Sequence, residues 1–157
     1  MSPTDKFFKL ASRANIPYEI YRGGRIDRGN GQGGCYWSGR TGKLAIWDKV
    51  RAIDLAHEIA HYLVVEKSEQ YSLNNYGLEL NLFNSKKQER NACLLHFHLA
   101  NIFDIPKDEI ETDMDNCSFL SEQSKSEVYM ESEEYAMQSH RNIILLARTI
   151  QGEQNVN

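Results

Sequence analysis

The sequence predicts a small α+β domain, with short strands near the N-terminus followed by longer helices. Residues 18–21, 34–38 and 43–47 are short runs of apolar and aromatic side chains bounded by turn residues, as expected for strands. From residue 49 onward, apolar residues recur at helical spacing instead. A chain of 157 residues, of which 41% are hydrophobic, is long enough for one core, so residues 1–157 are expected to form a single domain.

Residues 1–48 are expected to form one helix and a short, mainly antiparallel sheet. Ser2 and Pro3 are a typical helix N-cap and first helical position, and the apolar residues that follow predict a helix that ends before Pro17. Residues 39–42 have the composition of a hairpin turn. The glycines of residues 23–34 favour turns over a phosphate-binding loop, because no Lys-Ser/Thr pair follows them.

The most informative stretch is residues 56–62, which contains the pattern His-Glu-x-x-His. The flanking sequence lacks glycine and proline, and predicts a helix over about residues 49–67. His57 and His61 are one helical turn apart on the same face, where two imidazoles can bind one zinc ion. Glu58 lies one step round the helix, from where it could act as a general base on a metal-activated water. The alternative is a pair of core histidines hydrogen-bonded to the backbone.

Two histidines leave a catalytic zinc site one protein ligand short. The downstream candidates for this third ligand are Glu79, Glu89, His96 and His98. A second helix is predicted over residues 86–103, with Ser85 as its cap and Pro106 beyond its end. His96 and His98 lie on different faces of that helix, so at most one of them can face the metal.

Other side chains have weaker functional interpretations. Tyr71 and Tyr76, in a loop over residues 68–84, could stabilise an oxyanion, although packing on the loop is the simpler role. Trp37 and Trp47 are expected to pack in or beside the core. An edge of the strand pair that precedes the motif helix could hold an extended substrate by backbone hydrogen bonds.

The stretch of residues 55–63, preceded by two short strands and followed by Glu89-Arg90-Asn91-Ala92, resembles the ImmA/IrrE family of metallopeptidases. The resemblance covers about residues 34–106. It implies a zincin-type fold with two histidines of His-Glu-x-x-His and the glutamate of a downstream Glu-x-x-Ala helix as ligands. Carried over to this chain, His57, His61 and Glu89 would bind Zn²⁺, and Glu58 would be the catalytic base.

The C-terminal third is divided by its charge. Residues 104–134 contain 11 acidic and 2 basic side chains, in a chain whose net charge is −4. Within residues 107–134 we expect a short helix near residues 107–111 and a remainder that is mobile in part. Apolar spacing then predicts one last helix over about residues 134–151, in a C-terminal segment of residues 135–157.

Composition excludes some classes of protein. The chain contains no apolar run long enough to cross a membrane, and its N-terminus lacks the layout of a signal peptide. Three widely spaced cysteines fit a reducing cytosol, so a cytoplasmic location is expected. The acidic segment argues against direct nucleic-acid binding.

The motif and the resemblance together predict a zinc metalloprotease that cleaves a protein substrate, such as a transcriptional regulator. A rival hypothesis is a catalytically silent protein of the same fold, such as a phage or mobile-element factor that binds a host partner. A third is a protease kept latent by the thiolate of Cys35 on the zinc. The retained Glu58 favours the enzyme, because zinc binding alone does not need it.

Overall fold

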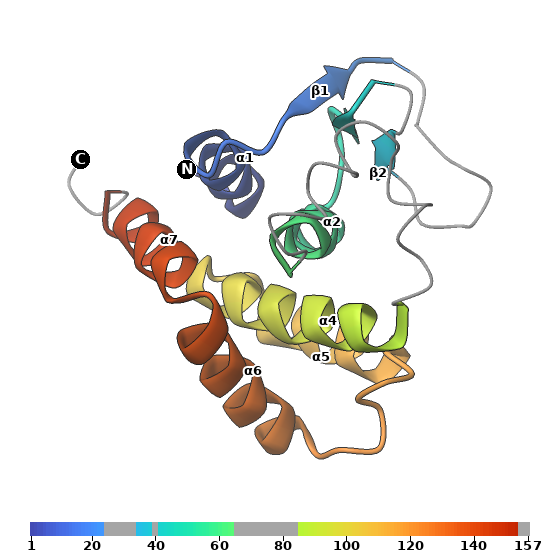
Figure 1. Ribbon diagram of the computed structural model, residues 1–157, viewed down its shortest axis with the longest axis vertical. Coiled ribbons are helices and arrows are strands. Elements are labelled where there is room, and N and C mark those ends of the chain that lie inside the picture. The colour runs from blue at the N-terminus through green and yellow to red at the C-terminus, as the bar shows by residue number, and fades with distance from the viewer. Residues whose placement is uncertain (24–33, 39–40, 65–84, 154–157) are drawn as a thin grey trace.

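The computed structural model describes residues 1–23, 34–38, 41–64 and 85–153. Within these ranges the chain has six helices and a three-stranded sheet, which confirms the α+β class (Figure 1). None of the described helices is long and apolar enough to cross a membrane. In chain order the elements are α1 (Pro3–Arg13), β1 (Tyr18–Tyr21), β2 (Cys35–Ser38), β3 (Lys43–Trp47), α2 (Ala52–Val64), α4 (Ser85–Ile102), α5 (Lys107–Asn116), α6 (Lys125–Ser139) and α7 (Arg141–Glu153).

Helix α1 begins as the sequence predicts. The Ser2 hydroxyl accepts the backbone N–H of Asp5, and the Asp5 carboxylate accepts the backbone N–H of Ser2, a reciprocal cap that satisfies two N–H groups at the helix start. The helix buries Phe7, whose ring meets that of Phe103 edge to face, with centroids 4.9 Å apart. At the other end of the chain, Glu153 of α7 accepts hydrogen bonds from α1, which brings the two terminal helices side by side (Figure 1).

The sheet has the order β1-β3-β2, with one parallel and one antiparallel pairing. The prediction of a mainly antiparallel sheet is therefore wrong, because β1 runs parallel to β3. The reason lies in β3, where Leu44, Ala45 and Ile46 are all buried, so this strand needs a neighbour on each side. Strand β2 occupies one side as a hairpin partner, and β1 occupies the other.

Helix α2 lies between the sheet and α4, and forms the centre of the fold (Figure 1). The side that faces the sheet is joined to β2 by the stacked rings of Trp37 and Tyr62, whose centroids are 5.4 Å apart. The described helix begins at Ala52 rather than at residue 49 and ends at Val64. Helix α2 buries six of its residues, namely Ile53, Leu55, Ala56, Ile59, Ala60 and Tyr62, so it is apolar on most of its surface. Polar side chains on this helix therefore need partners.

The segment of residues 107–134 differs from its prediction. Helix α5 extends to Asn116, and α6 begins at Lys125, with the Ser124 hydroxyl accepting the backbone N–H of Glu127. The buried residues of α6 are Val128, Ser132 and Ala136, which recur every fourth position and form a narrow stripe. Because the residues around them are mostly acidic and polar, the composition of the segment does not reveal this stripe. The remainder, expected to be mobile in part, is thus largely an ordered helix that packs against α4.

A single last helix over residues 134–151 is also wrong, because the chain turns at His140. This residue has φ −136° and ψ 36°, outside the helical region, and separates α6 from α7. The imidazole of His140 is hydrogen-bonded to the Tyr135 hydroxyl at 3.0 Å, which holds the corner together. Side chains with helical spacing continue on both sides of such a corner, so the spacing alone does not reveal it.

Candidate metal centre

Helices α2 and α4 bring His57, His61 and Glu89 to one point. Nε2 of His57 lies 2.9 Å from one carboxylate oxygen of Glu89, and Nε2 of His61 lies 2.9 Å from the other. The two Nε2 atoms lie 3.1 Å from each other. The three residues suggested by the motif and the resemblance are therefore neighbours in space, although Glu89 is 28 positions beyond His61 in the chain.

The local sequence accounts for this convergence. His57 and His61 are four residues apart on α2, so both rings leave the same face of the helix. On α4, Ala92 and Cys93 lie three and four residues beyond Glu89, and His96 lies four and three residues beyond them, so the four side chains form one stripe. Ala92 is fully buried in this stripe, and its small side chain takes little of the space between the helices.

The three donors fit a cation better than they fit hydrogen bonds. An ionised Glu89 carries no proton, and the two imidazole Nε2 atoms carry at most one proton each. Three mutual contacts of about 3 Å therefore share at most two protons, and one contact always sets two lone pairs or two N–H groups against each other. A metal ion about 2.0–2.2 Å from each donor would accept all three lone pairs, and tetrahedral ligands at that distance lie roughly 3.3 Å apart.

The carboxylate of Glu89 is paired with His57 and His61, and this pairing decides its protonation. Burial alone would raise the pKa of Glu89, but hydrogen bonds from His57 and His61 outweigh it and hold that pKa far below its usual range. Glu58 differs, because burial raises its pKa and the charges of the two histidines only partly offset this. The site thus combines one firmly ionised carboxylate with a second carboxylate, that of Glu58, which is more readily protonated.

A pocket of about 190 Å³ opens beside these residues. Its wall includes His57, Glu58 and Glu89, together with residues from the start of β2 and from the end of α5. Glu58 thus shares a water-accessible surface with two of the proposed ligands.

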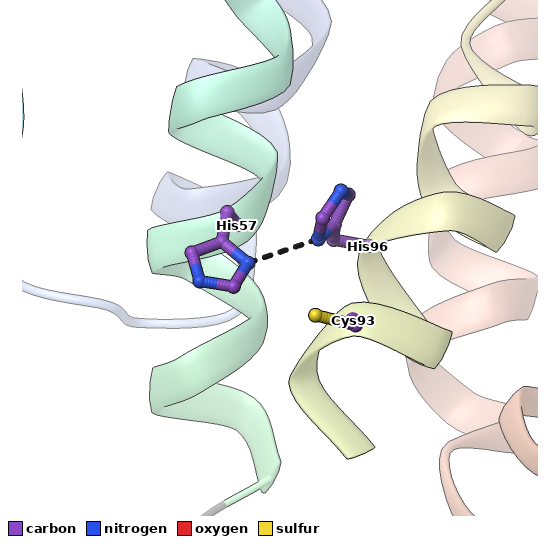
Figure 2. Close-up of side chains that lie close together, drawn as sticks. All are labelled: His57, Cys93 and His96. Carbon is purple, nitrogen blue, oxygen red and sulfur yellow. Dashed lines mark hydrogen bonds between the residues drawn. The ribbon is translucent and has the colours of Figure 1, made fainter. Parts of the chain in front are cut away.

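The other ring nitrogen of His57, Nδ1, contacts a second histidine, His96 of α4 (Figure 2). Nδ1 of His57 lies 3.0 Å from Nδ1 of His96, and Nε2 of His96 lies 3.0 Å from a carboxylate oxygen of Asp113 on α5. His96 is only 2% exposed, and burial lowers its pKa to about 4, so the ring is neutral at pH 7. Asp113 accepts the proton on its Nε2, which leaves Nδ1 as an acceptor for the Nδ1–H of His57.

This proton order agrees with a metal on the other side of His57. A neutral imidazole that donates from Nδ1 would offer an Nε2 lone pair to a metal on the side of His61 and Glu89. Without a metal, the same Nε2 donates to Glu89, and this hydrogen bond, together with nearby carboxylate charges, outweighs burial and raises the pKa of His57. A carboxylate behind a ligand histidine is a common device for fixing ring orientation. Here the carboxylate acts through one more residue, because Asp113 contacts His96 and His96 contacts His57.

A second set of donors shares His57 with the first. Ring nitrogens of His57 and His96 and the sulfur of Cys93 lie within 4.8 Å of one another, and Figure 2 shows the Cys93 sulfur directed towards α2. This set is a poorer metal site, because His57 and His96 are already joined by a hydrogen bond that occupies both Nδ1 atoms. The Cys93 sulfur also lies 3.2 Å from that of Cys117, within hydrogen-bond distance.

The remaining sequence candidates are placed as follows. His98 lies on another side of α4, in a separate pocket with Tyr129, Ser132 and Glu133. Tyr71, Tyr76 and Glu79, and the proposed loop that holds them, lie outside the described residues. Cys35 lines the pocket, but burial raises the pKa of its thiol well above the usual value, and it belongs to neither metal-donor set found among the described residues.

The sequence interpretation left out Asp113, Cys93 and Cys117. No motif links Asp113 to His96, because their contact depends on the angle between α4 and α5. The available signal was the position of Cys93 one turn beyond Glu89, which already placed it on the metal-facing side of that helix.

The comparisons with known proteins give no family assignment. No protein-family model, no curated protein and no solved structure matches this chain significantly. The resemblance to the ImmA/IrrE family therefore stays a prediction that rests on the residues quoted for it.

The first prediction concerns the third ligand. We expect purified wild-type protein to contain about one zinc ion per chain and Glu89→Ala to contain clearly less, because two histidines alone bind zinc weakly. Elemental analysis by mass spectrometry measures this, with the exposed Glu122→Ala as the matched control. Equal zinc contents in wild type and Glu89→Ala would contradict the assignment of Glu89.

The second prediction concerns the support behind His57. Asp113→Ala should weaken zinc binding by roughly 10–100-fold, because it frees His96 and hence the ring of His57 to rotate. A competition titration against a chromophoric chelator measures the affinity. Asp108→Ala, an exposed change on the same helix, should leave it unchanged. A folded Asp113→Ala protein with wild-type affinity would show that the His57–His96–Asp113 chain does not support the metal.

Proposed function

We propose that this protein is a zinc-dependent endopeptidase in which His57, His61 and Glu89 hold the metal and Glu58 is the general base. The observation that carries the proposal is the meeting of the three donors at about 3 Å, beside a pocket that Glu58 also lines. Two imidazoles and one carboxylate are a ligand set that suits zinc, and three protein ligands leave one coordination position for a water or a substrate.

The chemistry follows from these roles. When bound, zinc would supply Lewis acidity, which lowers the pKa of a water and polarises a carbonyl group. Glu58 would accept the proton of the attacking water and then deliver it to the leaving amine. Its neighbours on the helix, His57 and His61, would not take this part, because their Nε2 atoms would hold the metal and Nδ1 of His57 contacts His96.

The pocket suits a segment of a protein chain better than an enclosed small molecule. Its volume of about 190 Å³ is smaller than the roughly 300–1,000 Å³ of sites that enclose drug-sized ligands. Its wall includes Cys35 at the start of β2 and Phe119 beyond α5. The pocket is therefore lined by residues from the sheet and from the C-terminal part of the chain. We propose a protein substrate on this basis, and a regulatory protein such as a transcriptional regulator on the resemblance.

The third prediction tests the base. Glu58→Gln should retain zinc and lose at least about 100-fold of the peptidase rate, because the amide keeps the shape of the side chain and cannot accept a proton. Zinc-loaded protein incubated with a mixture of quenched fluorogenic peptides measures the rate. Glu122→Gln is the matched control at an exposed position.

A Glu58→Gln protein as active as wild type would exclude the proposed mechanism. Zinc in wild type with no cleavage of any peptide or protein would instead favour a binding protein that keeps the metal site without the reaction.

A further inference from the structure

Two cysteines meet in the wall of the pocket. The sulfur of Cys93 lies 3.2 Å from the sulfur of Cys117. Cys93 is on α4, one turn beyond Glu89, and Cys117 is the residue that ends α5. Both line the pocket that Glu58 and Glu89 also line. The pair therefore joins α4 to the end of α5, beside the contact of His96 with Asp113.

We propose that Cys93 and Cys117 are a redox-active pair that forms a reversible disulfide when a hydroperoxide enters the pocket. The proposal does not depend on peptidase activity. It rests on the contact between the two sulfurs, on their unequal exposure and on their place in the pocket wall.

Cys117 is the residue that meets the oxidant. Its side chain is half-buried, whereas Cys93 is only 4% exposed, so a molecule in the pocket reaches Cys117 first. Hydrogen bonding with Cys93 lowers the pKa of the Cys117 thiol to about 6, and the backbone N–H groups of Phe119 and Leu120 add to this effect against the opposing effect of burial. A thiolate that is accessible and lies beside a second thiol is the usual setting of a redox-sensitive cysteine.

The reaction balances in two steps. The Cys117 thiolate attacks one oxygen of the peroxide, the O–O bond breaks, and Cys117 becomes a sulfenic acid while the second oxygen leaves as water or an alcohol. The Cys93 sulfur then attacks the Cys117 sulfur, the S–O bond breaks, and the departing hydroxide takes the Cys93 proton as water. Two thiols are oxidised by two electrons and one peroxide is reduced.

Cys35 provides the contrast. It lines the same pocket, but it is 7% exposed and burial keeps its thiol protonated. No sulfur–sulfur contact involves it among the described residues. Cys35 should therefore stay reduced under conditions that oxidise the other two cysteines.

A disulfide here would fix the pocket wall. It would tie α4, which carries Glu89 and His96, to the end of α5, which carries Asp113. It would also remove the Cys93 sulfur as a rival donor beside His57 and His96. The redox state of the pair would thus act on the same helices that position the proposed metal ligands.

The test is a peptide map of the folded protein after brief treatment with hydrogen peroxide. Remaining thiols are alkylated, and the digest is analysed by mass spectrometry without reduction and again after dithiothreitol. We expect wild type to become about 2 Da lighter, to keep one alkylatable thiol, Cys35, and to show one peptide pair joined through Cys93 and Cys117. Reduction should restore all three thiols.

Matched variants make the result specific. Cys35→Ser should form the bond as wild type does, whereas Cys93→Ser and Cys117→Ser should not form an intramolecular disulfide. In untreated protein, the alkylation rate of Cys117 should reach half its maximum at a lower pH than that of an ordinary thiol, because the thiolate is the reacting form. Should either serine variant fail to fold, the wild-type map alone decides. The proposal is overturned if Cys93 and Cys117 both remain alkylatable after peroxide, or if the bond formed includes Cys35 or a second chain.

Discussion

The packing of α2 against α4 is the constraint on which the rest of the structure depends. Both helices are largely apolar where they meet, yet His57 and His61 on one side face Glu89 and His96 on the other. Polar groups in such an interface cost several kcal/mol each, by rough estimate, unless they find partners. The two helices are therefore held in a register that joins these four side chains, and the sheet and the C-terminal helices support that register from either side.

The polar chain across this interface has a direction. From the donor cluster it passes through His57 to His96 and ends at Asp113, an acceptor that needs no proton of its own. Each link uses one proton, which makes Nδ1 of His57 the donor to His96 and leaves Nε2 of His57 for a partner on the side of His61 and Glu89. The arrangement gives the buried His96 of α4 a partner at each of its ring nitrogens.

The sequence was informative where chemistry depends on local spacing. The four-residue interval of His57 and His61, the cap at Ser2 and the alternation of strands and glycines all act within a few residues, and the structure has the corresponding helices and strands. Glu89 was one of four candidates, and it was favoured by its place near the start of the second helix and by a resemblance.

Features that depend on the meeting of distant segments were not predicted. The parallel pairing of β1 with β3, the contact of Asp113 with His96 and the meeting of Cys93 with Cys117 depend on angles between elements, which spacing does not encode. The stripe of α6 was hidden because only three buried positions mark it in an acidic, polar sequence. The corner at His140 was hidden because apolar spacing continues across it.

The central claim is that zinc is held by nitrogen and oxygen donors from α2 and α4 and by no sulfur. X-ray absorption spectroscopy of the zinc-loaded protein tests it most directly, because zinc–sulfur bonds of about 2.3 Å differ clearly from zinc–nitrogen and zinc–oxygen bonds of about 2.0–2.2 Å. The account predicts a shell of nitrogen and oxygen alone, with the multiple scattering of two imidazoles. A sulfur neighbour at about 2.3 Å would place the metal with Cys93 and His96 instead, and would contradict the assignment of His57, His61 and Glu89 as the site.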